Sequence, residues 1–165
     1  MSVTITKDTV AEVLKQVREL THKEVLVGIP DANAGRKPDE GESVPISNAE
    51  IGYLMEFGSP AANIPARAHL VPGVEDALDP ITKRLRAGAK AAIDGKPRAA
   101  DQAMHAVGLT AQASVQRKIT DGPFEPLSPK TLAKRRARGR TGEKPLIDTG
   151  QYRRAITYVI RPKGK

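Results

Sequence analysis

The sequence predicts an α+β fold, with a small, mostly antiparallel sheet packed against helices, two long Ala-rich helices and extended loops. Residues 24–29 form an apolar, β-rich run, and Ile156, Tyr158 and Ile160 alternate near the C-terminus, so both stretches predict strands. Between them, apolar residues recur at helical spacing over residues 74–92 and 99–120. This order of elements indicates a sheet that helices cover on one side.

The N-terminal third predicts a short strand at Val3 and Ile5, an amphipathic helix, and the strand at 24–29. The helix begins after an N-cap, Asp8 or Thr9, whose side-chain oxygen can accept a free backbone N–H. Its apolar residues at helical spacing are Val10, Val13, Leu14, Val17 and Leu20. Residues 31–45 are polar and rich in turn-forming residues, and they predict a long exposed loop.

A capping box and several prolines shape the next segment. Ser47 and Glu50 have the spacing of a capping box, and they open a short helix that ends at Gly58. Residues 59–73 then contain three prolines, which predict an extended and stiff connector because each proline fixes its own φ and restricts the residue before it.

The two long helices and the C-terminal elements are separated by clear breaks. Asp79 and Pro80 mark either a kink or the true start of the first long helix, and residues 95–97 separate it from the second. Ser128 caps a short basic helix over 130–138, a loop follows over 139–145, and residues 148–150 form a turn or helix cap before the closing strand.

Composition limits the domain organisation. The 165 residues fit one domain, 1–165, and aromatic residues make up only 3%, so the core must be built from Val, Ile, Leu and Ala. The chain has no cysteine, and no apolar run approaches the roughly 20 residues of a membrane span. With no signal-peptide pattern at the start, the sequence predicts a soluble protein made in a cytoplasm.

Positive charge is concentrated at one end of the chain. Residues 126–165 contain 12 Lys or Arg and 2 acids, for a net charge of +10 within a total of +8, which leaves −2 for the remainder. This asymmetry points to a polyanion or an acidic protein as partner. The exposed loop 31–45 and the basic segment 126–165 are therefore the two charged regions to compare.

The residues that could carry catalysis do not converge in the sequence. His22, His69 and His105 lack metal-ligand spacing, and residues 139–144 lack the spacing of a phosphate-binding loop. We therefore predict no catalytic residue, no metal site and no cofactor, and we expect a protein that is not an enzyme. The less favoured alternative is a small hydrolase or nuclease with an unrecognised site.

The basic helix allows two interpretations. Its cations could neutralise phosphates in a salt-sensitive, sequence-independent way, with Arg135, Arg136, Arg138 and Arg140 facing DNA. No aromatic residue lies among them for base stacking, and no helix-turn-helix pattern is present. The other interpretation is a solvated face or a contact with an acidic neighbour.

Two stretches together resemble a known family. The first contains Glu56-Phe57-Gly58-Ser59 followed by residues 63–72 (NIPARAHLVP), and the second contains residues 126–131 (PLSPKT), the basic helix and residues 144–150 (KPLIDTG). In this order they resemble the tail-completion and neck proteins, also labelled virion morphogenesis proteins, of long-tailed bacteriophages. The chain departs from that pattern at Ala68 and His69, where Pro-Phe is favoured, and at Tyr152, where Leu is favoured.

The resemblance implies a structural protein of the virion, acting at the head–tail junction after assembly in the host cytoplasm. It implies a homo-oligomeric ring, commonly of six copies, with packaged double-stranded DNA passing through its centre. The implied partners are head-completion or stopper proteins on one side and tail-terminator or tail-tube proteins on the other, with no membrane. The alternative function is a sequence-independent nucleic-acid-binding protein that uses the basic C-terminal segment.

Candidate contacts follow from charge and stiffness. Six copies at +8 each carry +48, so acidic neighbours or DNA must offset their repulsion. We expect acids of the loop 31–45 in one copy to approach the basic helix of the next copy or of an adjoining ring. The interface candidates are Asp31, Asp39, Glu40, Glu42, Phe57, Ile64, Pro65, Arg67, Lys134, Arg135, Arg136, Arg138 and Arg140.

Overall fold

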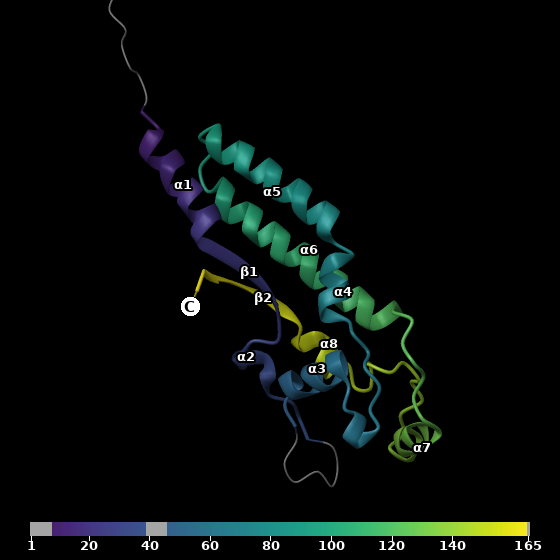
Figure 1. Ribbon diagram of the computed structural model, residues 1–165. Coiled ribbons are helices and arrows are strands. Elements are labelled where there is room, and N and C mark those ends of the chain that lie inside the picture. The colour runs from purple at the N-terminus through teal and green to yellow at the C-terminus, as the bar shows by residue number, and fades with distance from the viewer. Residues whose placement is uncertain (1–7, 39–45, 165) are drawn as a thin grey trace, which may run out of the picture.

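A computed structural model describes residues 8–38 and 46–164 of the chain. The strand predicted at Val3 and Ile5 lies outside the described residues, as do Asp39, Glu40 and Glu42. The predicted α+β class is confirmed (Figure 1). The described elements, in chain order, are α1 (Val10–His22), β1 (Lys23–Gly28), α2 (Asp31–Ala34), α3 (Asn48–Phe57), the 3₁₀ turn η1 (Pro60–Ala62), α4 (Leu70–Glu75), α5 (Leu78–Ile93), α6 (Ala99–Asp121), α7 (Pro129–Ala137), α8 (Gln151–Ala155) and β2 (Thr157–Pro162).

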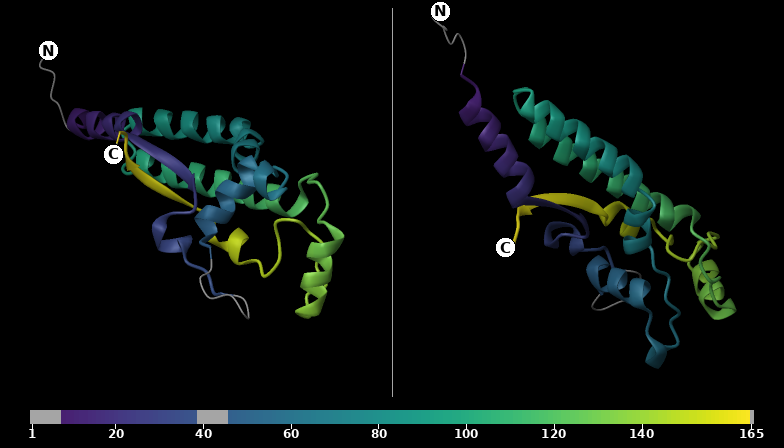
Figure 2. Two further views of the ribbon diagram at one scale, coloured as in Figure 1. Left: turned by 60° about the horizontal axis from the view of Figure 1, so that its bottom comes forward. Right: turned by 45° about the horizontal axis from the view of Figure 1, so that its top comes forward.

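The sheet consists of two antiparallel strands within the described chain. β1 and β2 pair from Lys23 opposite Pro162 to Gly28 opposite Thr157, so a strand near the start of the described chain pairs with the strand near its end. Helix α6 is the longest element and runs along the sheet, while α5 lies antiparallel to it on the far side (Figures 1 and 2). We call α1, α5 and α6 the helical layer.

Small residues let the elements around α6 approach closely, as the Ala-rich stripes predicted. A Cβ on Gly88 of α5 would lie only 2.1 Å from the Cβ of Ala103 on α6. A Cβ on Gly108 would lie 2.2 Å from the ring of Tyr158, so α6 meets β2 at that glycine. These contacts bring helix and strand backbones together at positions where no larger residue fits.

The hydrophobic core lies where α6 meets the C-terminal elements. Val115 and Ile119 of α6 pack with Leu146, Tyr152 and Ile156, and all five side chains are buried. Phe124 and apolar residues of α3, α4 and β1 pack around this cluster. The core therefore joins residues that are distant in sequence, and it holds the C-terminal segment against the middle of the chain.

Several predicted caps are confirmed. Ser47 and Glu50 form the capping box of α3 in both directions, and Ser128 accepts a hydrogen bond from the backbone N–H of Thr131 at the start of α7. Asp8 accepts from the N–H of Val10 at 2.9 Å, so its carboxylate holds the start of α1 although Thr9 is the N-cap residue.

Some local predictions were wrong. Residues Asp31–Ala34 form the short helix α2 instead of the start of a loop, and the connector 59–73 is extended only in part, because it contains η1 and the start of α4. The closing strand begins at Thr157, after the unpredicted helix α8. Asp79 and Pro80 lie in the first turn of α5, so they mark its true start.

Candidate subunit interface and its anchor

The segment after α3 folds back on itself as a short arm, residues 58–66. Ser59 and Ile64 pair as an antiparallel bridge, with N···O distances of 2.8 and 2.9 Å in the two directions. Gly58 starts the arm at a φ of 73°, and a Cβ there would lie 2.8 Å from the backbone nitrogen of Ala66. A side chain at Gly58 is therefore excluded by both its backbone angle and the returning chain.

Glu56 anchors the base of this arm. Its carboxylate accepts hydrogen bonds from the backbone N–H groups of His69, Leu70 and Val71, at 2.8, 2.9 and 3.1 Å. These are donors of the first turn of α4, which have no intrahelical acceptor. Burial by itself raises the pKa of Glu56, but these three hydrogen bonds and the nearby His69 hold the pKa below its usual value. The carboxylate stays ionised and caps α4 from a distance in sequence.

The two departures from the phage pattern, His69 and Tyr152, contact each other. His69 is fully buried, its Nδ1 lies 2.8 Å from the carbonyl oxygen of Arg67, and its Nε2 lies against the hydroxyl of Tyr152. Burial lowers the pKa of His69 and raises that of Tyr152, so both rings are neutral. Nδ1–H donates to the carbonyl, and the Tyr152 hydroxyl donates to Nε2.

Arg67 is a structural residue instead of the interface residue that we expected. It is 7% exposed, and its guanidinium donates to the carbonyl oxygens of Glu125 and Pro126 at 3.0 and 3.3 Å. The contacts of Arg67 and His69 join the two stretches that carry the phage resemblance. We call this unit, residues 48–75 together with 124–155, the anchored block.

Arg135 is also placed differently from the prediction. It was expected to face DNA or a neighbouring subunit, but it is 8% exposed. Its guanidinium donates to the carbonyl oxygens of Gly142, Lys144, Pro145 and Ile147, at distances of 2.9 to 3.4 Å. Burial lowers the pKa of Arg135 from its usual value while Asp148 opposes this effect, and the side chain organises the loop that follows α7.

The other basic candidates keep part of their exposure. Lys134 and Arg138 are exposed, Arg136 is exposed and lies 3.2 Å from Glu143, and Arg140 pairs with Asp148. Asp31 is exposed on α2. The expected contact between acidic loop and basic helix therefore loses Arg135, while Asp31, Arg136 and Arg138 lie at the surface.

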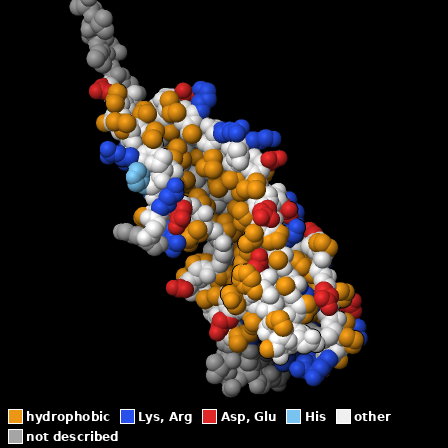
Figure 3. Space-filling view, in the orientation of Figure 1, with side chains coloured by type: hydrophobic (Ala, Val, Ile, Leu, Met, Phe, Trp, Pro, Cys, Tyr) orange, Lys and Arg blue, Asp and Glu red, His pale blue; other side chains and the backbone are white. Residues whose placement is uncertain are grey.

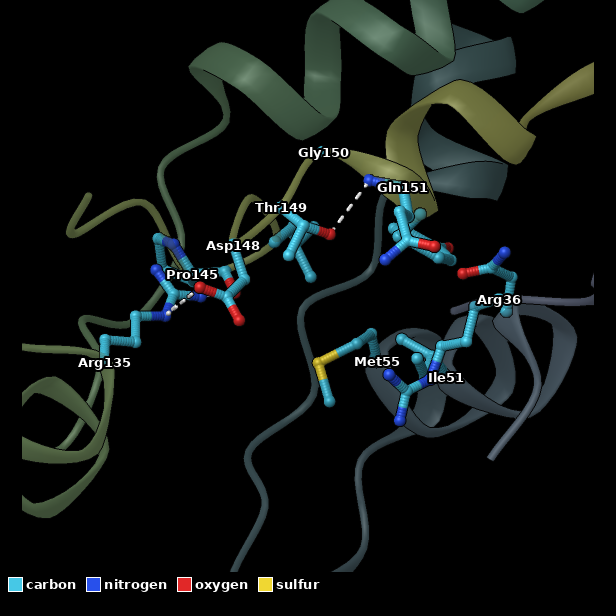
Figure 4. Close-up of a pocket in the computed structure, with 12 residues that line it drawn as sticks. Arg36, Ile51, Met55, Arg135, Pro145, Asp148, Thr149, Gly150 and Gln151 are labelled. Atoms are coloured by element: carbon cyan, nitrogen blue, oxygen red, sulfur yellow. Dashed lines mark hydrogen bonds and ion pairs between the residues drawn. The ribbon is translucent and has the colours of Figure 1, made fainter. Parts of the chain in front are cut away.

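A cavity of about 190 Å³ lies between α3 and the loop before α8 (Figure 4). Ile51 and Met55 line one wall, and Asp148, Thr149 and Gln151 line the other. Asn48 of α3 also lines the cavity, and its side-chain oxygen is buried and has no hydrogen-bond partner in the described chain. Among the described residues, no three His, Cys, Asp or Glu side chains gather closely enough to hold a metal ion.

Helix α1 presents its apolar side to solvent. Val10 and Leu14 are 63% and 54% exposed, whereas Gln16 is buried and bonds to the carbonyl of Lys96 and the N–H of Ala100, at 2.9 and 3.2 Å. Figure 3 shows hydrophobic side chains gathered in a band along the helical layer. Of the apolar stripe that the sequence predicted on α1, Val10, Leu14 and Val17 are exposed, and Val13 and Leu20 are half-buried within the described chain.

A second apolar surface lies on α3. Tyr53 and Phe57 are both 66% exposed, and their ring centroids are 4.9 Å apart. Ile64 and Pro65 of the arm are half-buried and line a groove between the arm and residues 125–131. Phe57, Ile64 and Pro65 are thus the interface candidates that retain an accessible apolar surface.

The sequence contained one signal for the missed role of Glu56. An acid in the last turn of a helix opposes the helix dipole, so such a residue points to a partner elsewhere in the fold. Gln16 gave no comparable signal, because its partners Lys96 and Ala100 lie 80 and 84 residues further along the chain. Arg135 gave none because nothing in the sequence distinguishes it from the neighbouring cations of the same helix.

No family model, curated protein or solved structure matches this chain. Within the described residues, no helix combines the length and apolar character that a membrane crossing needs.

Proposed function

We propose that the chain is a structural subunit of the head–tail junction of a long-tailed bacteriophage, where copies assemble into a ring around the DNA channel. The observation that carries this proposal is the uncovered apolar side of α1, together with the exposed Tyr53–Phe57 pair. A single chain gains nothing from exposing these side chains, whereas a neighbouring copy can bury them at about 25 cal/mol per Å².

The anchored block supports the same proposal. Its buried polar contacts hold the arm in one conformation before any partner binds, so little entropy is lost on association. The two stretches that resemble phage neck proteins are physically joined through Arg67 and His69. In the proposed ring this block is the rigid part, and the apolar surfaces are completed by other copies or by the adjoining head and tail proteins.

The alternative, a sequence-independent nucleic-acid-binding protein, has weaker support. Arg135 is buried and Arg136 and Arg140 contact acids of their own chain, so fewer cations face outward than the sequence suggested. Binding of a duplex by the isolated chain, with a steep loss of affinity between low and high salt, would favour this alternative.

The decisive experiment uses the phage that encodes the chain. When its gene is disabled, we expect DNA-filled heads and tails that are not joined, seen by electron microscopy, and joining restored when purified chain is added. Joined, infectious particles without the chain would refute the proposal. Negative-stain images of the purified chain, alone and with head and tail fractions, then show whether it forms rings.

A further inference from the structure

We infer that the two free edges of the β1–β2 sheet pair with each other between copies, so that β2 of one copy takes β1 of the next as an added strand. This inference rests on the proposed function, since it names the contact between neighbours in the ring. Strand addition of this kind uses backbone hydrogen bonds for affinity and side chains for register.

The hydrogen-bond pattern identifies the free backbone groups. The N–H of Lys163 donates to the carbonyl of His22 at 2.8 Å, so these residues form a hydrogen-bonded pair. Pairs alternate along an antiparallel ladder. Val25 opposite Ile160, and Val27 opposite Tyr158, are therefore the pairs whose N–H and C=O groups point away from the partner strand.

These outward groups have no hydrogen-bond partner in the part of the chain that the structure describes. At the end of the sheet, the N–H of Lys23 is already bound to the carbonyl of Glu19, and Pro162 has no N–H. Each edge thus offers two complete residues, Val25 and Val27 on β1 and Tyr158 and Ile160 on β2. Unpaired edges of this kind are templates for another strand.

The symmetry of a ring sets the direction of pairing. When the strands run along the ring axis, rotation about that axis preserves their direction, so β1 of the next copy runs antiparallel to β2. The two edges differ from each other, so their contact is a head-to-tail interface, and repeating such an interface can close a ring. In Figure 1, α1 runs on in line with β1 instead of crossing its outer edge.

Side-chain chemistry selects one register. With Ile160 opposite Val25 of the next copy, apolar residues meet on the side that faces α6. On the opposite face, Val159 then meets Leu26, and Arg161 meets Glu24. Within one copy, Arg161 and Glu24 are also opposite each other, with Nε of Arg161 2.9 Å from Oε1 of Glu24. A slip of two residues places Val159 opposite Glu24 or Arg161 opposite Leu26, and both of these pairings are unfavourable.

There is room for the added strand beside β2. A groove of about 530 Å³ lies along this edge, between β2 and the first turns of α6, with Asp101 and His105 on its helical wall. His105 lies 3.0 Å from the hydroxyl of Tyr158. Leu109, one turn later on α6, is 58% exposed, and an added strand beside β2 can cover it.

Single-cysteine variants test the pairing, because the natural chain has no cysteine. Leu26→Cys and Val159→Cys proteins are mixed under mild oxidation, with one of them isotopically labelled so that mixed dimers are identified by mass. In the inferred register these residues form a pair without hydrogen bonds, with Cα atoms about 4.5 Å apart, which suits a disulfide. We expect the mixed dimer at least tenfold above the dimer of either variant alone.

Leu26→Cys mixed with Leu85→Cys is the matched control, since Leu85 on α5 is as exposed as Val159, at 38%. Melting temperatures of all variants check that each is folded. If rings form without the mixed disulfide, the edge pairing is overturned and the proposed function stands. The edge pairing is also overturned if the Leu26→Cys and Val159→Cys mixture links no more than the Leu85 control. Dominant dimers of one variant with itself indicate a two-fold contact and also overturn it. A monomeric chain without linkage overturns it too, and the gene-disabled phage then decides the function separately.

Discussion

The anchored block and the helical layer differ in the polar side chains that they bury. The block buries Glu56, His69 and Arg135, and their hydrogen-bond partners lie in the first turn of α4, in α8 and in the loop after α7. The layer buries Gln16 and leaves Val10 and Leu14 exposed. The block is therefore held together by hydrogen bonds within one chain, although it exposes Tyr53 and Phe57, whereas the layer has apolar surface on α1 that no described residue covers.

The largest effect is expected from breaking the anchor of the block. Glu56→Ala removes the acceptor of three backbone N–H groups, so we expect the free energy of unfolding to fall by about 3 kcal/mol. Urea denaturation measures this loss. Glu50→Ala is the matched control in the same helix, because it removes only a fully exposed capping side chain and should cost clearly less. Equal losses for the two variants would contradict the anchor.

A double-mutant cycle tests the contact between the two departures from the phage pattern. His69→Phe alone leaves the buried hydroxyl of Tyr152 without its acceptor, and Tyr152→Leu alone leaves Nε2 of His69 without its donor. We expect each single change to cost about 2 kcal/mol. The double variant has apolar residues at both positions and should recover at least 1 kcal/mol of the summed loss. Simple additivity would show that the contact is not a coupled pair.

The block should also lose stability in mild acid. Burial lowers the pKa of His69, so the unfolded chain binds a proton that the folded chain excludes. The stability that the neutral ring contributes is fully present above the unfolded pKa of about 6.5, and it is lost as the pH falls toward the folded pKa. In this range the free energy of unfolding falls by at most about 1.4 kcal/mol per pH unit. Glu56 adds a second loss below about pH 4.5, because its folded pKa is also lowered.

Denaturation curves between pH 8 and pH 5 measure this dependence. His69→Phe combined with Tyr152→Leu is the control, since it removes the titrating ring together with the buried hydroxyl that contacts it. A slope that persists unchanged in this variant would assign the acid loss to other residues.

The smallest effect on folding is expected in the helical layer. Leu14→Glu replaces a side chain that is 54% exposed, so the free energy of unfolding should change by less than about 0.5 kcal/mol. Self-association should weaken at least tenfold, because in the proposed ring the charge enters a surface that another copy covers. Sedimentation velocity measures the association. Lys15→Glu, the adjacent exposed position, separates the loss of apolar contact from the change of charge.

Much of the fold follows from local pattern. The capping box at Ser47, the cap at Ser128 and the long helices were predictable because their signals lie within a few residues of one another. Helix α8 was missed because it has only five residues, although residues 148–150 were predicted as a turn or helix cap and Gly150 is its N-cap, with a φ of 77°. The apolar stripe of α1 was predictable, but periodicity identifies an apolar face without saying what covers it.

The sequence by itself determined the α+β class, the helix caps and the concentration of positive charge near the C-terminus, because each depends on neighbouring residues or on composition. Only the tertiary structure decided that Arg67 and Arg135 are buried, that His69 contacts Tyr152, and that both edges of the sheet are unpaired within the described residues. The physical reason is that the energy of a buried polar group depends on its hydrogen-bond partner. Arg67 and His69 find partners 58 and 83 residues away, and the carbonyl groups that Arg135 binds converge only when the loop after α7 folds.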